Sequence, residues 1–136
     1  MKTCGIEIDK HEVIFVCLEK YDDDNIEITS DLKKISLLND EDPVQIWVFF
    51  DLIKSHLDTI NPDKVAIIKL SKGKFSASSI SSKIEGILQL YRNSQIKLIA
   101  PTTLTAYYKK NDIPLTAKYK YQESALKLAY YLMIKA

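Results

Sequence analysis

Tyrosines and lysines are interleaved between residues 107 and 121, and this composition has the chemistry of a nucleic-acid-binding surface. Aromatic rings stack on bases, and lysine ammonium groups neutralise phosphates. Packing of the helices is the alternative explanation, and it is the better one for Tyr107 and Tyr121, which fit the buried spacing of their helices. The candidate binding residues are Tyr108, Lys109, Lys110, Lys118, Tyr119 and Lys120.

A second basic segment, Ser71 to Phe75, leads into a serine-rich helix start at residues 76–82. Unpaired backbone amides at a helix N-terminus attract anions, so Lys72 and Lys74 beside them indicate a candidate phosphate contact. An ordinary solvated loop is the alternative. Serine is a common N-cap residue, and the segment lacks the glycines of a Walker-type loop.

Two carboxylates lie on one face of the first predicted strand. From Thr3 to Asp9 the residue types alternate with a period of two, which is the pattern of a β-strand. Glu7 and Asp9 share a face, and Ile6 and Ile8 lie on the opposite one. The strand is therefore predicted to carry an acidic face near its end.

The next segment, Val13 to Leu18, is a continuous apolar run typical of a strand that is buried on both faces. A tight turn at residues 10–11 predicts a hairpin in which Cys4 lies opposite Cys17 and Glu7 lies opposite Ile14. A redox pair is one interpretation of the two cysteines. We expect free, buried thiols, because the sequence shows neither a disulfide scaffold nor a zinc motif.

The remaining elements alternate between helices and strands. Residues 26–29 and 32–37 predict one long strand with a bulge near Lys33 and Lys34. Asp42 followed by Pro43 is typical of a helix start. The predicted elements from there on are a helix to residue 59, a strand at 64–70, a helix at 76–91, a strand at 95–100, a short helix to 110 and a final helix at 121–135. The order β-β-β-α-β-α-β-α-α predicts an α/β fold with a mixed five-stranded sheet.

Length and composition indicate a single domain spanning residues 1–136, with 46% apolar residues. The 19 lysines and arginines nearly balance 18 aspartates and glutamates, so nucleic-acid or membrane binding requires a local patch. The sequence shows neither a signal peptide nor a run of about 18 apolar residues. We expect a cytoplasmic protein with no membrane partner.

Four short motifs carry a family resemblance. They are Gly5-Ile6-Glu7, Asn61-Pro62-Asp63-Lys64-Val65-Ala66-Ile67, Leu98-Ile99-Ala100-Pro101-Thr102 and Glu123-Ser124-Ala125-Leu126. With the order of elements, they resemble the RNase H-like superfamily, and within it the RuvC-like resolvases and a family of short uncharacterised bacterial proteins. The resemblance covers nearly the whole chain and implies a three-layer RNase H-like fold.

The resemblance also implies a site for phosphodiester hydrolysis by two divalent ions, Mg²⁺ or Mn²⁺, held by carboxylates. It assigns a strand ligand to Glu7 and a helix ligand to Glu123. The fourth-strand acid of the family falls on Ile68 or Lys69, neither of which binds a cation, although Asp9 could partly replace it. The resemblance thus implies a remnant acidic site without efficient nuclease activity.

Three functions remain open from the sequence. The favoured one is a degenerate RNase H-like domain that binds DNA or RNA, and a weak nuclease that uses Mg²⁺ or Mn²⁺ is a variant of it. The third is a non-catalytic interaction or regulatory module, which forms a homodimer or binds another protein through exposed aromatic residues such as Trp47 or Phe50.

Overall fold

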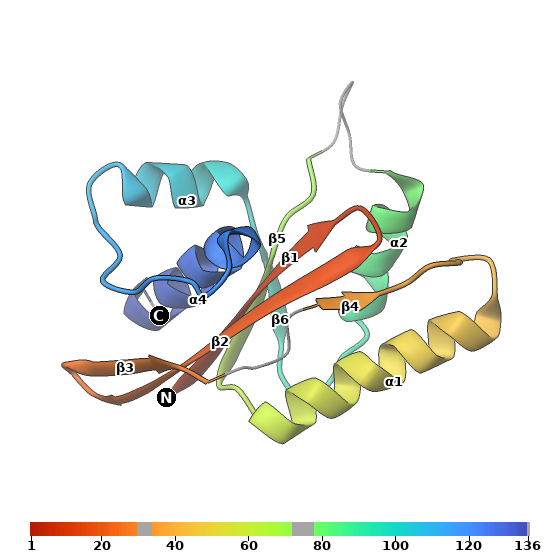
Figure 1. Ribbon diagram of the computed structural model, residues 1–136, viewed down its shortest axis with the longest axis horizontal. Coiled ribbons are helices and arrows are strands. Elements are labelled where there is room, and N and C mark those ends of the chain that lie inside the picture. Colours follow the sequence, from red (N-terminus) through yellow and green to blue (C-terminus); the bar gives the residue numbers. More distant parts are fainter. Residues whose placement is uncertain (30–33, 72–77, 136) are drawn as a thin grey trace.

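The centre of the sheet is a hairpin of β1 (Lys2–Asp9) and β2 (Glu12–Asp22) in the computed structural model, which describes residues 1–29, 34–71 and 78–135 (Figure 1). The antiparallel register pairs Glu7 with Ile14 and Cys4 with Cys17, which confirms the predicted register. The tight turn between the strands places Lys10 in the left-handed region, with φ of 57°.

The expectation of free thiols is wrong in this structure, because Cys4 and Cys17 form a disulfide. Their Cα atoms lie 4.2 Å apart on adjacent strands, and both side chains are fully buried. The short separation is typical of a non-hydrogen-bonded antiparallel pair, in which opposite side chains are closest. The disulfide therefore links the two central strands inside the core.

The predicted third strand is divided into two strands. β3 (Asn25–Ile28) pairs with the far end of β2, and β4 (Lys34–Ser36) pairs with residues 12–14 near the hairpin turn. Both are antiparallel to β2 and occupy the same side of it. Within the described ranges the sheet therefore has six strands where five were predicted, in the order β3-β2-β1-β5-β6 with β4 also on β2.

The other half of the sheet is parallel. α1 (Pro43–Ile60) connects the hairpin side to β5 (Lys64–Ile68), which pairs with β1, and α2 (Ser79–Leu88) leads to the edge strand β6 (Ile96–Ile99). The Asp42 side chain accepts a hydrogen bond from the amide of Val44, as expected of an N-cap residue. Parallel and antiparallel pairs together make the mixed sheet that the sequence predicted.

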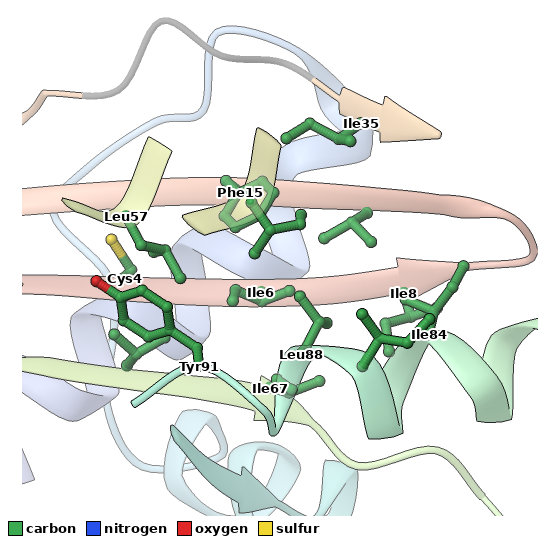
Figure 2. Packing of buried hydrophobic residues seen from close by; sticks show 14 of the residues in the cluster. Cys4, Ile6, Ile8, Phe15, Ile35, Leu57, Ile67, Ile84, Leu88 and Tyr91 are labelled. Atoms are coloured by element: carbon green, nitrogen blue, oxygen red, sulfur yellow. The ribbon is translucent and has the colours of Figure 1, made fainter. Parts of the chain in front are cut away.

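α1 and α2 cover one face of the sheet. Alternate residues of β1, such as Ile6 and Ile8, point into this layer (Figure 2). They pack against Ile53 and Leu57 of α1 and other buried residues. Residues of β1 on the opposite face, including Glu7, face the second helical layer.

That second layer contains α3 (Pro101–Tyr108), a 3₁₀ turn η1 (Lys120–Gln122) and α4 (Glu123–Lys135) (Figure 1). α4 lies across β1, β2 and β5, where its buried residues pack on Ile14, Val16 and Ala66. The structure is thus the predicted three-layer α/β arrangement. None of the helices in the described ranges is both long and apolar enough to cross a membrane.

Candidate functional site

A cavity of about 570 Å³ lies between α3 and α4, at the carboxyl ends of the neighbouring strands β1 and β5. Ligands of open α/β sheets commonly bind at this edge. Lining residues come from both strands and both helices, so the site depends on how the helical layer sits on the sheet. They are Glu7, Ile68, Pro101, Leu104, Thr105, Tyr108, Lys109, Ser124 and Lys127.

The position of α4 over β1 depends on Thr3 and Gly5, which alternate along β1 with the buried apolar residues and face this helix. The hydroxyl of Thr3 donates a 2.8 Å hydrogen bond to the carbonyl of Ala129. Gly5 lies against the backbone of the same helix, where a β-carbon would overlap the carbonyl oxygen of Ala125. Glu7, two residues further along the strand, therefore points to the first turn of α4.

Glu7 is half-buried, and its surroundings disfavour the charged form. Burial is the largest cause of its raised pKa, and the negative charge of Asp9 raises the pKa further. A hydrogen bond with the side chain of Ser124 acts in the opposite direction and lowers the pKa. Perturbed carboxyl groups that lie in clefts are candidates for functional residues.

The residue beside Glu7 on the parallel strand is Ile68. Ile6 pairs with Ile67 at the end of the β1–β5 ladder, so Glu7 and Ile68 are the next residues along the two strands, and both line the cavity. Lys69 is exposed and does not line the cavity, and its backbone amide donates to the carbonyl of Ile99. Of the two positions left open by the sequence, Ile68 is the one that faces Glu7.

The structure does not bring Glu7 and Glu123 together in one cavity. Glu123 lines a separate cavity of about 260 Å³ with Ile113, Leu115 and other residues, while Ser124 takes the place beside Glu7. Asp9 is exposed and close enough for its charge to act on Glu7. No group of three or more His, Cys, Asp or Glu residues within the described ranges could hold a metal ion. The residues of the cavity therefore do not fit a two-metal centre.

Two of the predicted binding residues, Tyr108 and Lys109, line the Glu7 cavity. The Tyr108 hydroxyl donates a 2.6 Å hydrogen bond to the carbonyl of Lys127, and the Lys127 ammonium lies 5.5 Å from the Tyr108 ring. Burial is the main cause of the raised pKa of Tyr108. Lys110 is exposed just beyond α3 and does not line the cavity.

The other predicted residues form a separate group around η1. The rings of Tyr119 and Tyr121 are stacked, with centroids 5.6 Å apart and planes 8° from parallel. The Lys118 ammonium lies 5.5 Å from the Tyr119 ring, and that of Lys34 lies 4.2 Å from the Tyr121 ring. Lys120 is exposed at the start of η1. Lys72 and Lys74 lie outside the described residues.

Sequence reasoning missed three polar residues of the Glu7 cavity, which are Thr105, Ser124 and Lys127. Ser124 and Lys127 are three positions apart in α4, a spacing that puts side chains on the same helix face. Because both residues lie in the predicted final helix, this spacing could have predicted that Ser124 and Lys127 share a helix face. Thr105 had no comparable signal, because its position depends on how α3 packs.

Comparison with solved structures identifies the fold. A structure of Thermus thermophilus RuvC has a TM-score of 0.73 and 10% identity, with 99% of this chain and 97% of RuvC covered. A complex of T. thermophilus RuvC with a Holliday junction substrate has a TM-score of 0.70 and 10% identity, covering 98% and 96% of the two chains. Fowlpox virus resolvase in complex with Holliday junction DNA has a TM-score of 0.51 and 16% identity, covering 95% and 88%.

These similarities confirm the expected RNase H-like, RuvC-like fold, and at such low identity they establish the fold alone. The curated proteins contain no significant match to this sequence. Residues 1–132 match the family described as "Protein of unknown function (DUF3010)", and the chain therefore belongs to that family.

Proposed function

We propose that this protein binds nucleic acid in the Glu7 cavity without cleaving it efficiently. The observation that carries the proposal is the make-up of the cavity, where a single carboxylate lies with two lysines, Lys109 and Lys127. Ammonium groups bind phosphates, and the hydroxyls of Thr105 and Ser124 donate hydrogen bonds to phosphate oxygens. The resolvases that share this fold were solved with Holliday junction DNA, which supports DNA as the ligand.

Burial raises the pKa of Glu7, so protonation of this carboxyl group costs less than protonation of an exposed one. A phosphate bound beside Glu7 would raise the pKa further, and the protonated carboxyl group would donate a hydrogen bond to a phosphate oxygen. Ile68, on the neighbouring strand, contributes an apolar wall and no charge. The cavity thus supplies positive charge and donors to a phosphodiester but lacks the carboxylate set that two-metal hydrolysis requires.

The stacked pair of Tyr119 and Tyr121 supports a second contact near the start of α4. Aromatic side chains bind bases of single-stranded or unpaired nucleic acid, and lysines beside them add phosphate contacts. Lys118 and Lys34 flank this pair at the distances given above. We place the phosphates of a branched or single-stranded DNA at Lys109 and Lys127 and an unpaired base near Tyr119.

Electrophoretic mobility shifts with a Holliday junction and with single-stranded DNA test the proposal at about 50 mM and about 200 mM salt. We expect retardation at micromolar protein that weakens as the salt concentration rises, because phosphate contacts release counterions. Absence of any salt-sensitive retardation with both DNAs would overturn the proposal.

A double variant, Lys109→Gln with Lys127→Gln, should weaken DNA binding and lower the salt slope by about 2, because each lysine neutralises about one phosphate. The matched control is Lys20→Gln with Arg92→Gln, which removes the same charge away from the cavity. Equal weakening in both double variants would indicate a general charge effect and contradict the assignment to this cavity.

A weak nuclease that uses Mg²⁺ or Mn²⁺ is the variant of this proposal that a metal titration tests. The melting temperature is measured as Mn²⁺ is added to the wild type and to Glu7→Gln. We expect equal shifts in the two proteins, because one carboxylate in the cavity does not make a divalent-ion site. A shift that is present in the wild type and lost in the variant would favour a metal bound at Glu7.

Self-association is a second candidate function, and the outer face of α1 favours it. Val44, Trp47, Val48 and Leu52 are spaced along one side of this helix and are between 52% and 64% exposed. A two-fold axis would set this apolar stripe against the same stripe of a second copy. Sedimentation equilibrium tests the candidate, with a dimer expected for the wild type and a monomer for Trp47→Lys. A monomeric wild type would exclude it.

A further inference from the structure

A second cavity, of about 550 Å³, lies at the opposite end of the sheet from Glu7. It is bounded by the start of β5, the residues around β6 and the last turns of α4. None of its lining residues belongs to the Glu7 cavity. They are Asp63, Lys64, Val65, Gln95, Lys97, Ile99, Tyr131, Leu132 and Lys135.

The cavity exists because α4 does not cover the edge of the sheet. α4 packs on β1, β2 and β5, whereas β6 has β5 as its neighbour in the sheet. Lys97 is paired with Ala66, whose small side chain points to the same face, and Tyr131 and Lys135 stand four residues apart on α4. The edge strand and the helix thus form two walls, and β5 lies between them.

Three lysines, Lys64, Lys97 and Lys135, line this cavity together with one residue that carries a carboxylate. That carboxylate, of Asp63, already accepts a 2.8 Å hydrogen bond from the backbone amide of Lys2. In the described part of the chain, ion pairs involve Lys20, Lys34, Lys54 and Lys83, and none involves the three cavity lysines. The Lys135 ammonium lies 5.7 Å from the centre of the Tyr107 ring, a contact that does not neutralise its charge. The positive charge of the three lysines is therefore available to an anion.

The rest of the lining is apolar or aromatic. Ile99 and Leu132 contribute apolar side chains, whereas the Val65 side chain is buried in the core on the opposite face of the sheet. The Tyr131 ring is held in an edge-to-face contact with Tyr107, with centroids 5.2 Å apart. Ligand pockets typically enclose about 300–1,000 Å³, with mainly apolar walls and a few polar groups that fix orientation. This cavity fits that description and adds a concentration of positive charge.

We propose that this cavity binds a nucleotide, with its phosphates at Lys64, Lys97 and Lys135 and its base against the Tyr131 ring. Several ammonium groups at one place bind the closely spaced negative charges of a polyphosphate as point charges. The planar base of the nucleotide would stack on the Tyr131 ring and contact the aliphatic side chains of the cavity wall. The site is separate from the proposed nucleic-acid site and does not depend on it.

Isothermal titration calorimetry of the full chain in buffer with EDTA tests this proposal, with ATP, AMP, adenosine and pyrophosphate as the probes. We expect ATP to bind most tightly, AMP more weakly, and adenosine and pyrophosphate at least about tenfold more weakly than ATP. Absence of heat from ATP at millimolar concentration would overturn the proposal. Pyrophosphate binding as tight as ATP binding would overturn the placement of the base.

The double variant Lys64→Gln with Lys97→Gln should reduce the affinity for ATP by at least about tenfold. Lys97 is exposed and Lys64 is half-buried, and circular dichroism checks that the fold is retained. The matched control, Lys20→Gln with Arg92→Gln, removes the same charge outside both cavities and should bind ATP as the wild type does. Equal loss of ATP affinity in this control would contradict the proposal. Loss of ATP binding in Lys109→Gln with Lys127→Gln, but not in Lys64→Gln with Lys97→Gln, would assign the nucleotide to the Glu7 cavity and overturn the proposal.

Discussion

Gly5 of β1 lies directly against the backbone of Ala125 in α4. A β-carbon at this position would overlap the Ala125 carbonyl oxygen and would come 2.7 Å from the amide nitrogen of Ala129. The missing side chain lets the helix pack on the strand at the closest range, and this contact sets Ser124 beside Glu7. The shape of the Glu7 cavity therefore depends on a glycine that does not line it.

Substitution Gly5→Ala should destabilise the protein by about 1–3 kcal/mol or more, because the neighbours that must move are backbone atoms. Chemical denaturation measures the change in the free energy of unfolding. Gly86→Ala is the matched control, since nothing lies within 4 Å of a β-carbon there and the residue is in α2. This control should gain about 0.5–1 kcal/mol from helix propensity. Similar effects of the two substitutions would contradict the close packing of α4 on β1.

Substitution Glu7→Gln should stabilise the protein at neutral pH. The folded-state pKa of Glu7 is raised by burial, so the stability linked to its proton is present at acid pH and lost as pH rises through that pKa. Gln mimics the protonated form and avoids this loss. Thermal melts at several pH values should show the advantage of the variant at neutral pH and its disappearance below about pH 4, where Glu is protonated in both states. Equal stability of the two proteins at every pH would contradict a raised pKa of Glu7.

The disulfide of Cys4 and Cys17 should be detectable as resistance to alkylation. Under denaturing, non-reducing conditions we expect neither cysteine to react with iodoacetamide, as read by mass spectrometry. A reductant should lower the free energy of unfolding by about 2–4 kcal/mol, because the cross-link constrains the unfolded chain. The same reductant should leave the double variant Cys4→Ala with Cys17→Ala unchanged. Complete alkylation of the unreduced protein would support free thiols instead.

His56 should make the protein less stable as the solution becomes acidic. Burial lowers the pKa of this residue, which packs edge-to-face on Phe15 at 5.0 Å. Its unfolded-state pKa is near 6.5, about the free value, so the unfolded chain takes up the proton first when pH falls below that range. Urea denaturation between about pH 7.5 and pH 5 should show a steeper loss of stability for the wild type than for His56→Gln. Equal slopes would mean that His56 titrates normally in the folded protein.

The sequence determined those features that follow from patterns along a short stretch of chain. Alternation from Thr3 to Asp9 and the tight turn after it were enough to predict the hairpin register, because a strand has a period of two and a short turn leaves few alternatives. The Asp42 cap followed equally from neighbouring residues. The order of elements, with four short motifs, led to the RNase H-like fold that the comparison with solved structures confirms.

Only the tertiary structure decided which side chains share a site. It placed Ile68 rather than Lys69 beside Glu7, and it put Ser124 rather than Glu123 next to Glu7. It also linked Cys4 to Cys17 in a disulfide. It also gathered Lys64, Lys97 and Lys135 around one cavity, although they are far apart in the sequence. The disulfide forms within the hairpin whose register the sequence predicted. The other relations depend on the pairing of β1 with β5 and on the docking of α4 on the sheet, and no local pattern along the chain encodes contacts between such distant elements.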